Sequence, residues 1–183
     1  IVGIISGISS GTFLDKFFTS VCEIILAFPG ILLALVVAGM LGSGIFNIMI
    51  SIALIGWAKY ARIIRSLVID IKSADYIKAA KVSGSSNLTI VKKHIIPNIL
   101  DVVATVFVTD IGMTILRISS LSFIGLGVSQ PQAEWGMMIN DARIFIETKP
   151  MMIVYPIITI GLVAFSFHLI GDGLREKRNK NVI

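Results

Sequence analysis

Charged residues and cysteine are scarce in this sequence, and both shortages exclude classes of protein. Charged side chains make up only 15% of the 183 residues, whereas soluble domains carry about a quarter. Apolar residues make up 55% of the chain, and the mean hydropathy is +0.91. The single cysteine, Cys22, excludes an intramolecular disulfide and a cysteine-based metal cluster, so we expect it to be a small buried apolar residue. The composition therefore predicts a membrane protein.

Sequence motifs for chemistry are missing as well. There is no G-x-x-x-x-G-K-[ST] loop, so the chain has no Walker-type cradle for the phosphates of ATP. His, Cys and carboxylate residues do not cluster at ligand spacing, so we expect no catalytic residue, no metal and no other cofactor, and we expect His168 to be structural. The net charge of +5 is gathered in two segments, so we expect no nucleic-acid partner. The chain is therefore not expected to be an enzyme.

The uncharged runs are long enough to cross a bilayer more than once. As one helix, the run from Ile24 to Ala58 would measure about 52 Å, whereas the hydrocarbon core is about 30 Å thick. The run must therefore fold back, and the predicted reversal is Gly42-Ser43-Gly44. Pro29-Gly30 is expected to kink the first of the two resulting spans.

The pattern predicts a polytopic all-α membrane protein with one transmembrane domain over residues 1–183. Because the chain opens with Ile1 inside an apolar segment, we expect an N-terminal portion to be missing. A polar turn is expected at 11–19. The expected membrane segments are a partial span at 1–10 and spans at about 22–41, 45–65, 98–117 and 151–170.

The basic residues predict how these spans are oriented. One group lies on both sides of the central loop 73–97: Lys59, Arg62, Arg65, Lys72, Lys78, Lys81, Lys92 and Lys93. A second group lies in the tail: Arg175, Lys177, Arg178 and Lys180. The positive-inside rule puts the central loop and the C-terminus in the cytoplasm. Residues 118–149 carry more acids than bases and are expected to face out.

The longest polar interruption runs from Ser73 to Asn98, and its first part predicts a short helix. Ser73 is expected to cap this helix, and Asp75 lies in its first turn, where a negative charge suits the helix dipole. Its apolar spacing places Tyr76, Ala79 and Ala80 on one face. Gly84 is expected to end the helix, since glycine tolerates the left-handed conformation required there.

The second part of this interruption predicts another short helix. Ser86 or Asn87 is expected to cap it, and its apolar face is expected to hold Leu88, Val91 and Ile95. Lys92, Lys93 and His94 lie near its C-terminal end. Pro97 is expected to stop this helix and to serve as an early residue of the next.

Two charged residues lie inside the predicted span 98–117. Asp110 and Arg117 are seven residues apart and therefore share a helix face. A charge inside a membrane is costly and usually faces a polar interior, so one interpretation is that both line a pathway through the helix bundle. The alternative is that Arg117 lies near the outer interface while Asp110 is hydrogen-bonded within the helix bundle.

The order of residues in the central stretch resembles that of a known family. Ala79-Ala80, then Gly84, then His94-Ile95-Ile96-Pro97-Asn98 resembles the "EAA" loop of ABC-importer permeases. The spacing from Tyr76 to Asn98 is similar to that of the second permease in the dipeptide, oligopeptide and nickel group. Lys78 stands where the name of the motif implies Glu. The resemblance extends to residues 26–35, 56–66 and 121–131 and to Trp135-Gly136, and so covers nearly the whole chain.

The resemblance implies the transmembrane fold of a type I ABC importer and a place in the bacterial inner membrane. It implies that the chain is one permease half, paired with a second permease, two cytoplasmic ATPases and an external or periplasmic substrate-binding protein. The 73–97 loop would then be the coupling region that docks into the ATPase, and 121–149 an external cap. The coupling residues that match the motif are Tyr76, Lys78, Ala79, Ala80, Gly84, His94, Pro97 and Asn98.

Peptides, nickel and metal–chelator complexes all remain open as substrates. One alternative is a secondary transporter driven by an ion gradient, which would be expected to show paired broken helices with coupling-ion ligands at mid-membrane. Asp110 is the one deep carboxylate that would serve such a mechanism. A membrane scaffold that transports nothing is a second alternative.

Overall fold

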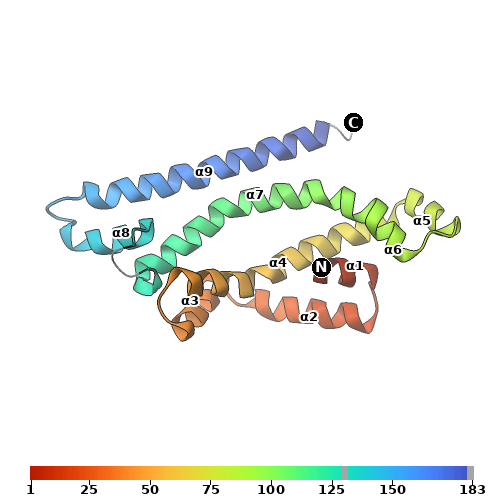
Figure 1. Ribbon diagram of the computed structural model, residues 1–183, viewed down its shortest axis with the longest axis horizontal. Helices are drawn as coiled ribbons and strands as arrows, with labels where there is room; N and C mark the ends of the chain where they lie inside the picture. Colours follow the sequence, from red (N-terminus) through yellow and green to blue (C-terminus); the bar gives the residue numbers. More distant parts are fainter. Residues whose placement is uncertain (129–131, 181–183) are drawn as a thin grey trace. The chain divides into compact units, whose positions relative to one another are not determined.

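The computed structural model describes residues 1–128 and 132–180, and Figure 1 follows the chain through them. All regular structure in these residues is helical, in agreement with the expected all-α class. The end of the 121–131 motif, part of the expected cap and the last residues of the tail lie outside the described residues. The elements are α1 (Val2–Ile8), α2 (Phe13–Ala27), α3 (Gly30–Leu41), α4 (Ile45–Ser73), α5 (Asp75–Val82), α6 (Asn87–Ile90), the π-helical turn η1 (Val91–Ile95), α7 (Ile96–Leu121), the π-helical turn η2 (Ser122–Leu126), α8 (Trp135–Ala142), the 3₁₀ turn η3 (Arg143–Phe145) and α9 (Met151–Lys180).

Two helical segments in the described residues are long and apolar enough to cross a membrane. Asn87–Leu126 contains the predicted span 98–117, and Met151–Lys177 contains the predicted span 151–170. The pair α2 and α3 is a third candidate if both helices belong to one broken span. The predicted span 45–65 lies within the single helix α4. The position of these helices across a bilayer stays a prediction.

The first apolar stretch differs in detail from the sequence prediction. The expected polar turn at 11–19 is shorter, because Thr12 caps α2 and the helix already begins at Phe13. The expected kink is a full break, since Phe28 is extended and α3 begins only after Pro29. The residue before a proline is pushed out of the helical region by the proline ring, which explains a break at this point. Residues 42–44 separate α3 from α4, and α3 packs back on α4 through Ala34, Ala38 and Ile48, so the chain reverses there, as predicted.

The chain folds as two compact units, and the long helices α4 and α7 contribute residues to both. Unit 1 comprises Ile1–Phe28 and Gly56–Ala104. Unit 2 comprises Pro29–Ile55 and the described residues from Thr105 onward. The candidate coupling residues all belong to unit 1, whereas Asp110 and Arg117 belong to unit 2.

In unit 1, α1 packs closely against α4 through its glycines. A Cβ atom added at Gly3 would collide with the carbonyl of Ala61, and one added at Gly7 would lie 2.6 Å from the Cβ atom of Val68. Small residues spaced four apart permit this approach of two helices. Cys22 is buried beside Ala58 and Ala61, as the sequence analysis predicted.

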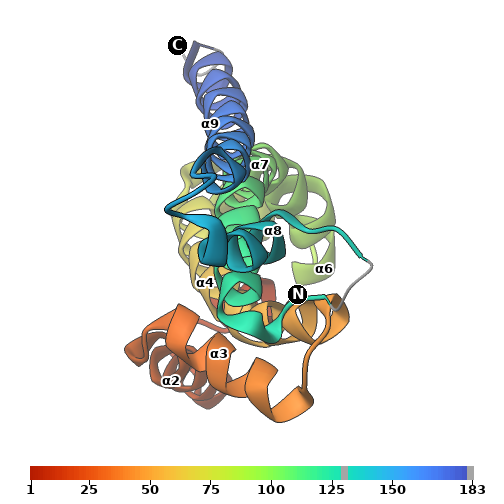
Figure 2. The same ribbon diagram turned by 90° about the vertical axis from the view of Figure 1, so that its left-hand side faces the viewer.

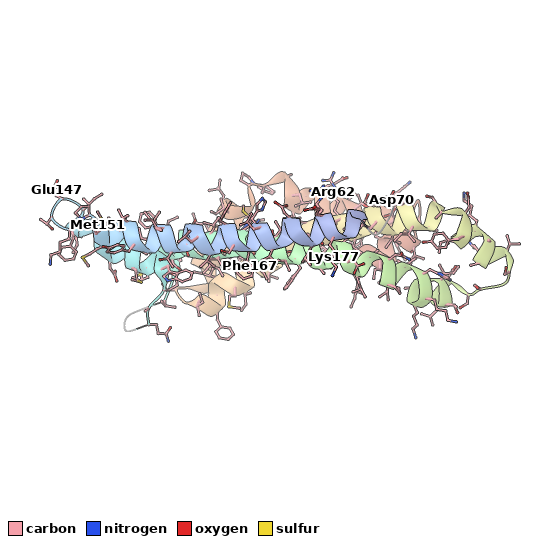
Figure 3. All side chains as sticks on the ribbon, turned by 90° about the horizontal axis from the view of Figure 1, so that it is seen from above. Arg62, Asp70, Glu147, Met151, Phe167 and Lys177 are labelled. Atoms are coloured by element: carbon pink, nitrogen blue, oxygen red, sulfur yellow. The ribbon has the colours of Figure 1, made fainter. Side chains whose placement is uncertain are left out.

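In unit 2, α8 lies along the first turns of α9 and also packs against η2 (Figures 1 and 2). Gly136 of α8 approaches the backbone of Ser119 so closely that no side chain would fit between them. A separate core of α3, α4 and α7 residues is formed by Ala34, Ala38, Ile48 and Leu121. Met151, Phe167 and Lys177 are labelled along α9 in Figure 3. Much of the apolar surface of α9 is exposed, including Tyr155, Leu162 and Phe165, as expected of a helix that faces lipid or a partner.

Candidate functional site

The first helix of the central loop, α5, forms without the predicted cap. Ser73 is the last residue of α4, and its hydroxyl donates a hydrogen bond to the carbonyl of Asp70. Ala74 takes the N-cap position instead and offers no side-chain bond. The prediction of a Ser73 cap is therefore wrong, because α4 continues eight residues beyond the predicted span 45–65 and ends at Ser73 itself. Asp75 lies in the first turn, as predicted, and pairs with Lys78 at 2.9 Å on the surface.

Gly84 ends α5 as the sequence predicted. Its φ angle is +87°, in the left-handed region that glycine adopts without a Cβ penalty. The backbone N–H of Ser85 bonds to the carbonyl of Ala80, and that of Gly84 to the carbonyl of Lys81. These two bonds form a Schellman motif, which satisfies carbonyls that would otherwise lack a partner at the end of the helix.

The second part of the loop is a helix that changes its winding. Ser86 caps α6, and its hydroxyl accepts the N–H of Thr89 at 3.2 Å. The helix continues through the π-helical turn η1 into α7 and does not stop at Pro97. Pro97 has no N–H to donate to the carbonyl one turn earlier, and a wider turn accommodates its ring. The side-chain amide of Asn98 donates to the carbonyl of His94 at 2.6 Å, which supports the same turn.

A shared apolar core holds the two parts of the loop together. Ile77 of α5, Ile90 of α6 and Ile95 of η1 are buried against Val68 of α4. Leu88, which the sequence placed on this inner face, is instead 63% exposed. The inner face is set by Ile90 and Ile95, because the π-helical turn shifts the register of the residues that follow it.

The outer face of the loop carries apolar and small side chains. Val82 is 90% exposed, Tyr76 is half exposed and Ala79 is exposed. We call the exposed residues Tyr76, Ala79, Val82 and Leu88 the docking surface. Tyr76, Ala79 and Val82 are spaced three apart along α5, so their exposed side chains form one stripe, which is typical of a site that a partner covers. Sequence reasoning missed Val82 and placed Leu88 on the inner face of the loop.

The structure brings some of the predicted coupling residues together and separates others. The rings of Tyr76 and His94 meet across the loop, with centroids 6.0 Å apart. Lys78 projects into solvent with its partner Asp75. Gly84 lies at the turn, whereas Pro97 and Asn98 lie at the start of α7. The eight residues therefore form a loop with a folded inner side rather than one cluster of contacting side chains.

Asp110 and Arg117 face each other along α7, as their spacing predicted. The nearest oxygen and nitrogen atoms are 3.7 Å apart, which is beyond hydrogen-bond range. The side chain of Asp110 is 7% exposed and that of Arg117 is 33% exposed. The guanidinium group therefore keeps donors available while its charge stays near a buried carboxylate.

A second pair of acid and base, Asp15 and Arg65, was missed at the sequence level. Arg65 donates two hydrogen bonds to the Asp15 carboxylate, from Nε at 2.6 Å and from Nη2 at 2.8 Å. The hydroxyl of Ser6 and the backbone N–H of Gly11 donate to the same carboxylate, at 2.5 and 3.0 Å. This arrangement ties α1 and α2 to α4, and a cavity of about 160 Å³ lies beside it. Nothing in the local sequence distinguishes Asp15 from an ordinary first-turn acid.

No group of His, Cys, Asp and Glu residues that could hold a metal ion occurs within residues 1–128 and 132–180. Together, the fold and the loop geometry supply an exposed docking surface on a rigid base and a polar pair on a membrane-length helix.

Comparison with known proteins is consistent with these features. Residues 1–179 match the model of the family described as "Binding-protein-dependent transport system inner membrane component". The chain is similar to the glutathione transport system permease protein GsiD of Shigella flexneri serotype 5b and to that of Escherichia coli O6:K15:H31. Each is 39% identical over 162 residues, which are 88% of this chain and 54% of the relative. The chain thus spans about half the length of the curated relatives it matches.

Proposed function

Because the chain belongs to the family of binding-protein-dependent transport system inner membrane components, with the all-α transmembrane fold of type I ABC importers, we propose that it forms half of a substrate pathway that is opened and closed by separate ATPases. Members of this family are transport permeases and not enzymes. A second permease would complete the pathway, and an external binding protein would deliver the substrate.

The docking surface is the observation that carries this proposal. Helix α5 is held from behind by the buried Ile77, while Tyr76, Ala79 and Val82 remain exposed in front. A short helix with small and apolar outer residues suits the groove of a partner protein. The loop 73–97 would lie in the cytoplasm, as its basic residues favour, and would pass the closure of the ATPases to the spans.

Peptides are the substrate class that we favour over nickel. The two relatives are named for transport of glutathione, which is itself a tripeptide. In unit 2, the buried Asp110 beside the half-buried Arg117 offers charges of both signs to a zwitterionic solute. Uptake of radiolabelled tripeptide and of nickel, compared in cells with and without the intact permease, separates the two classes. Restoration of nickel uptake alone would contradict the peptide proposal.

Substitutions on the loop test the coupling proposal. The space around Gly84 is open, so Gly84→Val does not clash within the chain. Because the backbone at Gly84 is left-handed, the valine side chain imposes a backbone strain of about 1–2 kcal/mol. It also adds bulk on the docking side. We expect Gly84→Val and Ala80→Trp to weaken co-purification of the ATPase or to uncouple ATP hydrolysis from substrate uptake in proteoliposomes.

Two control variants separate shape from strain and from charge. Gly84→Ala carries most of the backbone strain with little added volume, so it is expected to retain more coupling than Gly84→Val. Lys78→Ala removes an exposed ion pair worth about 0–1 kcal/mol and is expected to matter little. If Gly84→Val and Ala80→Trp behave as wild type while Lys78→Ala abolishes coupling, the loop is not a docking element recognised by its shape.

A further inference from the structure

A groove on the side of α5 opposite the docking surface is lined by lysines and by apolar side chains. Its volume is about 170 Å³, and residues from five elements of unit 1 contribute to it. Ile8, Ile77, Ile90 and Ile95 line it, and because the last three are buried we treat this apolar part as its floor. Lys72, Lys78 and Lys81 also line it and are exposed, so we place them at its rim. No Asp or Glu is among the residues that line it.

The two faces of α5 separate this groove from the docking surface. With 3.6 residues per turn, one side of α5 carries the side chains of Ile77, Lys78 and Lys81. Tyr76 and Ala79 point to the other side by the same geometry. A partner that covers Tyr76 and Ala79 therefore contacts a different side of α5 from the groove.

The three lysines differ in whether an acidic side chain neutralises their charge. The Nζ atom of Lys72 donates to the carbonyl of Ile8 at 2.5 Å, which holds the ammonium group at the rim but leaves its charge uncompensated. Lys78 is paired with the exposed Asp75. Among the residues that the structure describes, Lys81 has no acid within ion-pair distance. The rim thus carries excess positive charge above an apolar floor.

We propose that this groove binds the headgroup of an anionic phospholipid from the inner leaflet, with the phosphate at Lys72 and Lys81. Charge complementarity selects this occupant, since basic pockets at the cytoplasmic ends of helices suit acidic headgroups. An apolar cavity of about 150 Å³ accommodates a benzene-sized molecule, so this groove has room for the headgroup linkage and the first methylene groups. The remaining acyl chains would extend from its open side. This inference rests on the proposed cytoplasmic position of the loop and goes beyond the proposed transport function.

Native mass spectrometry of the intact permease tests the proposal. The protein is equilibrated in mixed micelles that contain equal amounts of phosphatidylglycerol and phosphatidylcholine, and retained lipids are counted. We expect wild-type protein to retain phosphatidylglycerol preferentially. Lys81→Gln and Lys72→Gln should each lower its affinity about fivefold, which corresponds to the roughly 1 kcal/mol contributed by one lysine near an acidic membrane surface.

Matched variants make the result specific to the groove. Lys92→Gln removes the same charge from an exposed position in the same loop but outside the groove, so it should leave retention unchanged. Val91→Phe adds bulk inside the groove without a charge change and should lower lipid retention as well.

Three outcomes would overturn the proposal. Equal losses in Lys81→Gln and Lys92→Gln would mean that diffuse surface charge, and not the groove, attracts lipid. Unchanged lipid retention with lost ATPase co-purification in Lys81→Gln would assign the groove to a protein partner. Displacement of the lipid by millimolar inorganic phosphate would assign it to the free anion. None of these measurements requires transport, so the proposal can fail while the transport function stands.

Discussion

The buried pair of Asp15 and Arg65 leads to a quantitative prediction about the stability of unit 1. The side chain of Asp15 is 4% exposed, and its carboxylate accepts bonds from Arg65, Ser6 and the backbone of Gly11. Asp15→Ala removes the anion and leaves the guanidinium group without its partner. Breaking a buried ion pair in this way typically costs about 3–5 kcal/mol. Because Arg65 is 30% exposed and can be partly rehydrated, we expect the lower end, about 3 kcal/mol.

Thermal unfolding of the purified intact permease in detergent measures this loss. By the scaling for chains of 150–250 residues, about 3 kcal/mol corresponds to a fall in Tm of about 6–12 °C. Asp70→Ala is the matched control, since Asp70 is an exposed acid on α4 in the same unit (Figure 3). Surface substitutions of this kind usually change stability by less than about 0.5 kcal/mol.

A double variant tests the physical reason for the loss. Asp15→Ala with Arg65→Met removes both charges and replaces the guanidinium stem with an apolar side chain of similar length. We expect it to be more stable than Asp15→Ala alone, because no uncompensated charge remains. The coupling between the two sites should exceed about 1 kcal/mol. A Tm for Asp15→Ala equal to that of Asp70→Ala, or strictly additive losses in the double variant, would refute the reasoning.

The remaining predictions concern transport, topology and ATP. Asp110→Asn should keep a substantial part of ATP-driven uptake, since a single deep carboxylate has no second acid for a proton relay; complete loss with normal assembly would favour ion coupling. In a Cys22→Ser background, an impermeant thiol reagent on intact cells should label a cysteine at Gln132 but not one at Ser83, and labelling at Ser83 would reverse the topology. The purified chain should hydrolyse no ATP, because it has no phosphate-binding loop; turnover that persists after removal of contaminating ATPases would disprove this.

The features of the central loop that could be predicted from the sequence are those specified by local chemistry. Gly84 at the end of α5, Ser86 at the start of α6 and Pro97 early in α7 each act on the backbone within one turn of themselves. Such effects need no knowledge of distant residues. The exposure of Leu88 could not be predicted in this way, because it depends on the register that η1 imposes.

The features that escaped sequence reasoning depend on contacts between distant residues. Asp15 and Arg65 are 50 residues apart, and each looks like an ordinary charged residue near a helix end. Ser73 is a good cap by type, but packing of Val68 and Ile77 in one core keeps α4 helical up to that residue. Tertiary packing overrides a local capping preference of about 1 kcal/mol when several apolar side chains are buried together.

The two pairs of aspartate and arginine suit opposite roles because their geometry differs. Asp15 and Arg65 lie on different helices and make two short charge-assisted bonds, so any relative movement of α2 and α4 within unit 1 would break both. Asp110 and Arg117 lie on one helix with 3.7 Å between their nearest charged atoms, so their side chains can separate without shifting a helix. The first pair is therefore suited to holding α1, α2 and α4 together as one unit. The second is suited to exchanging partners, as a charge that meets a passing solute must.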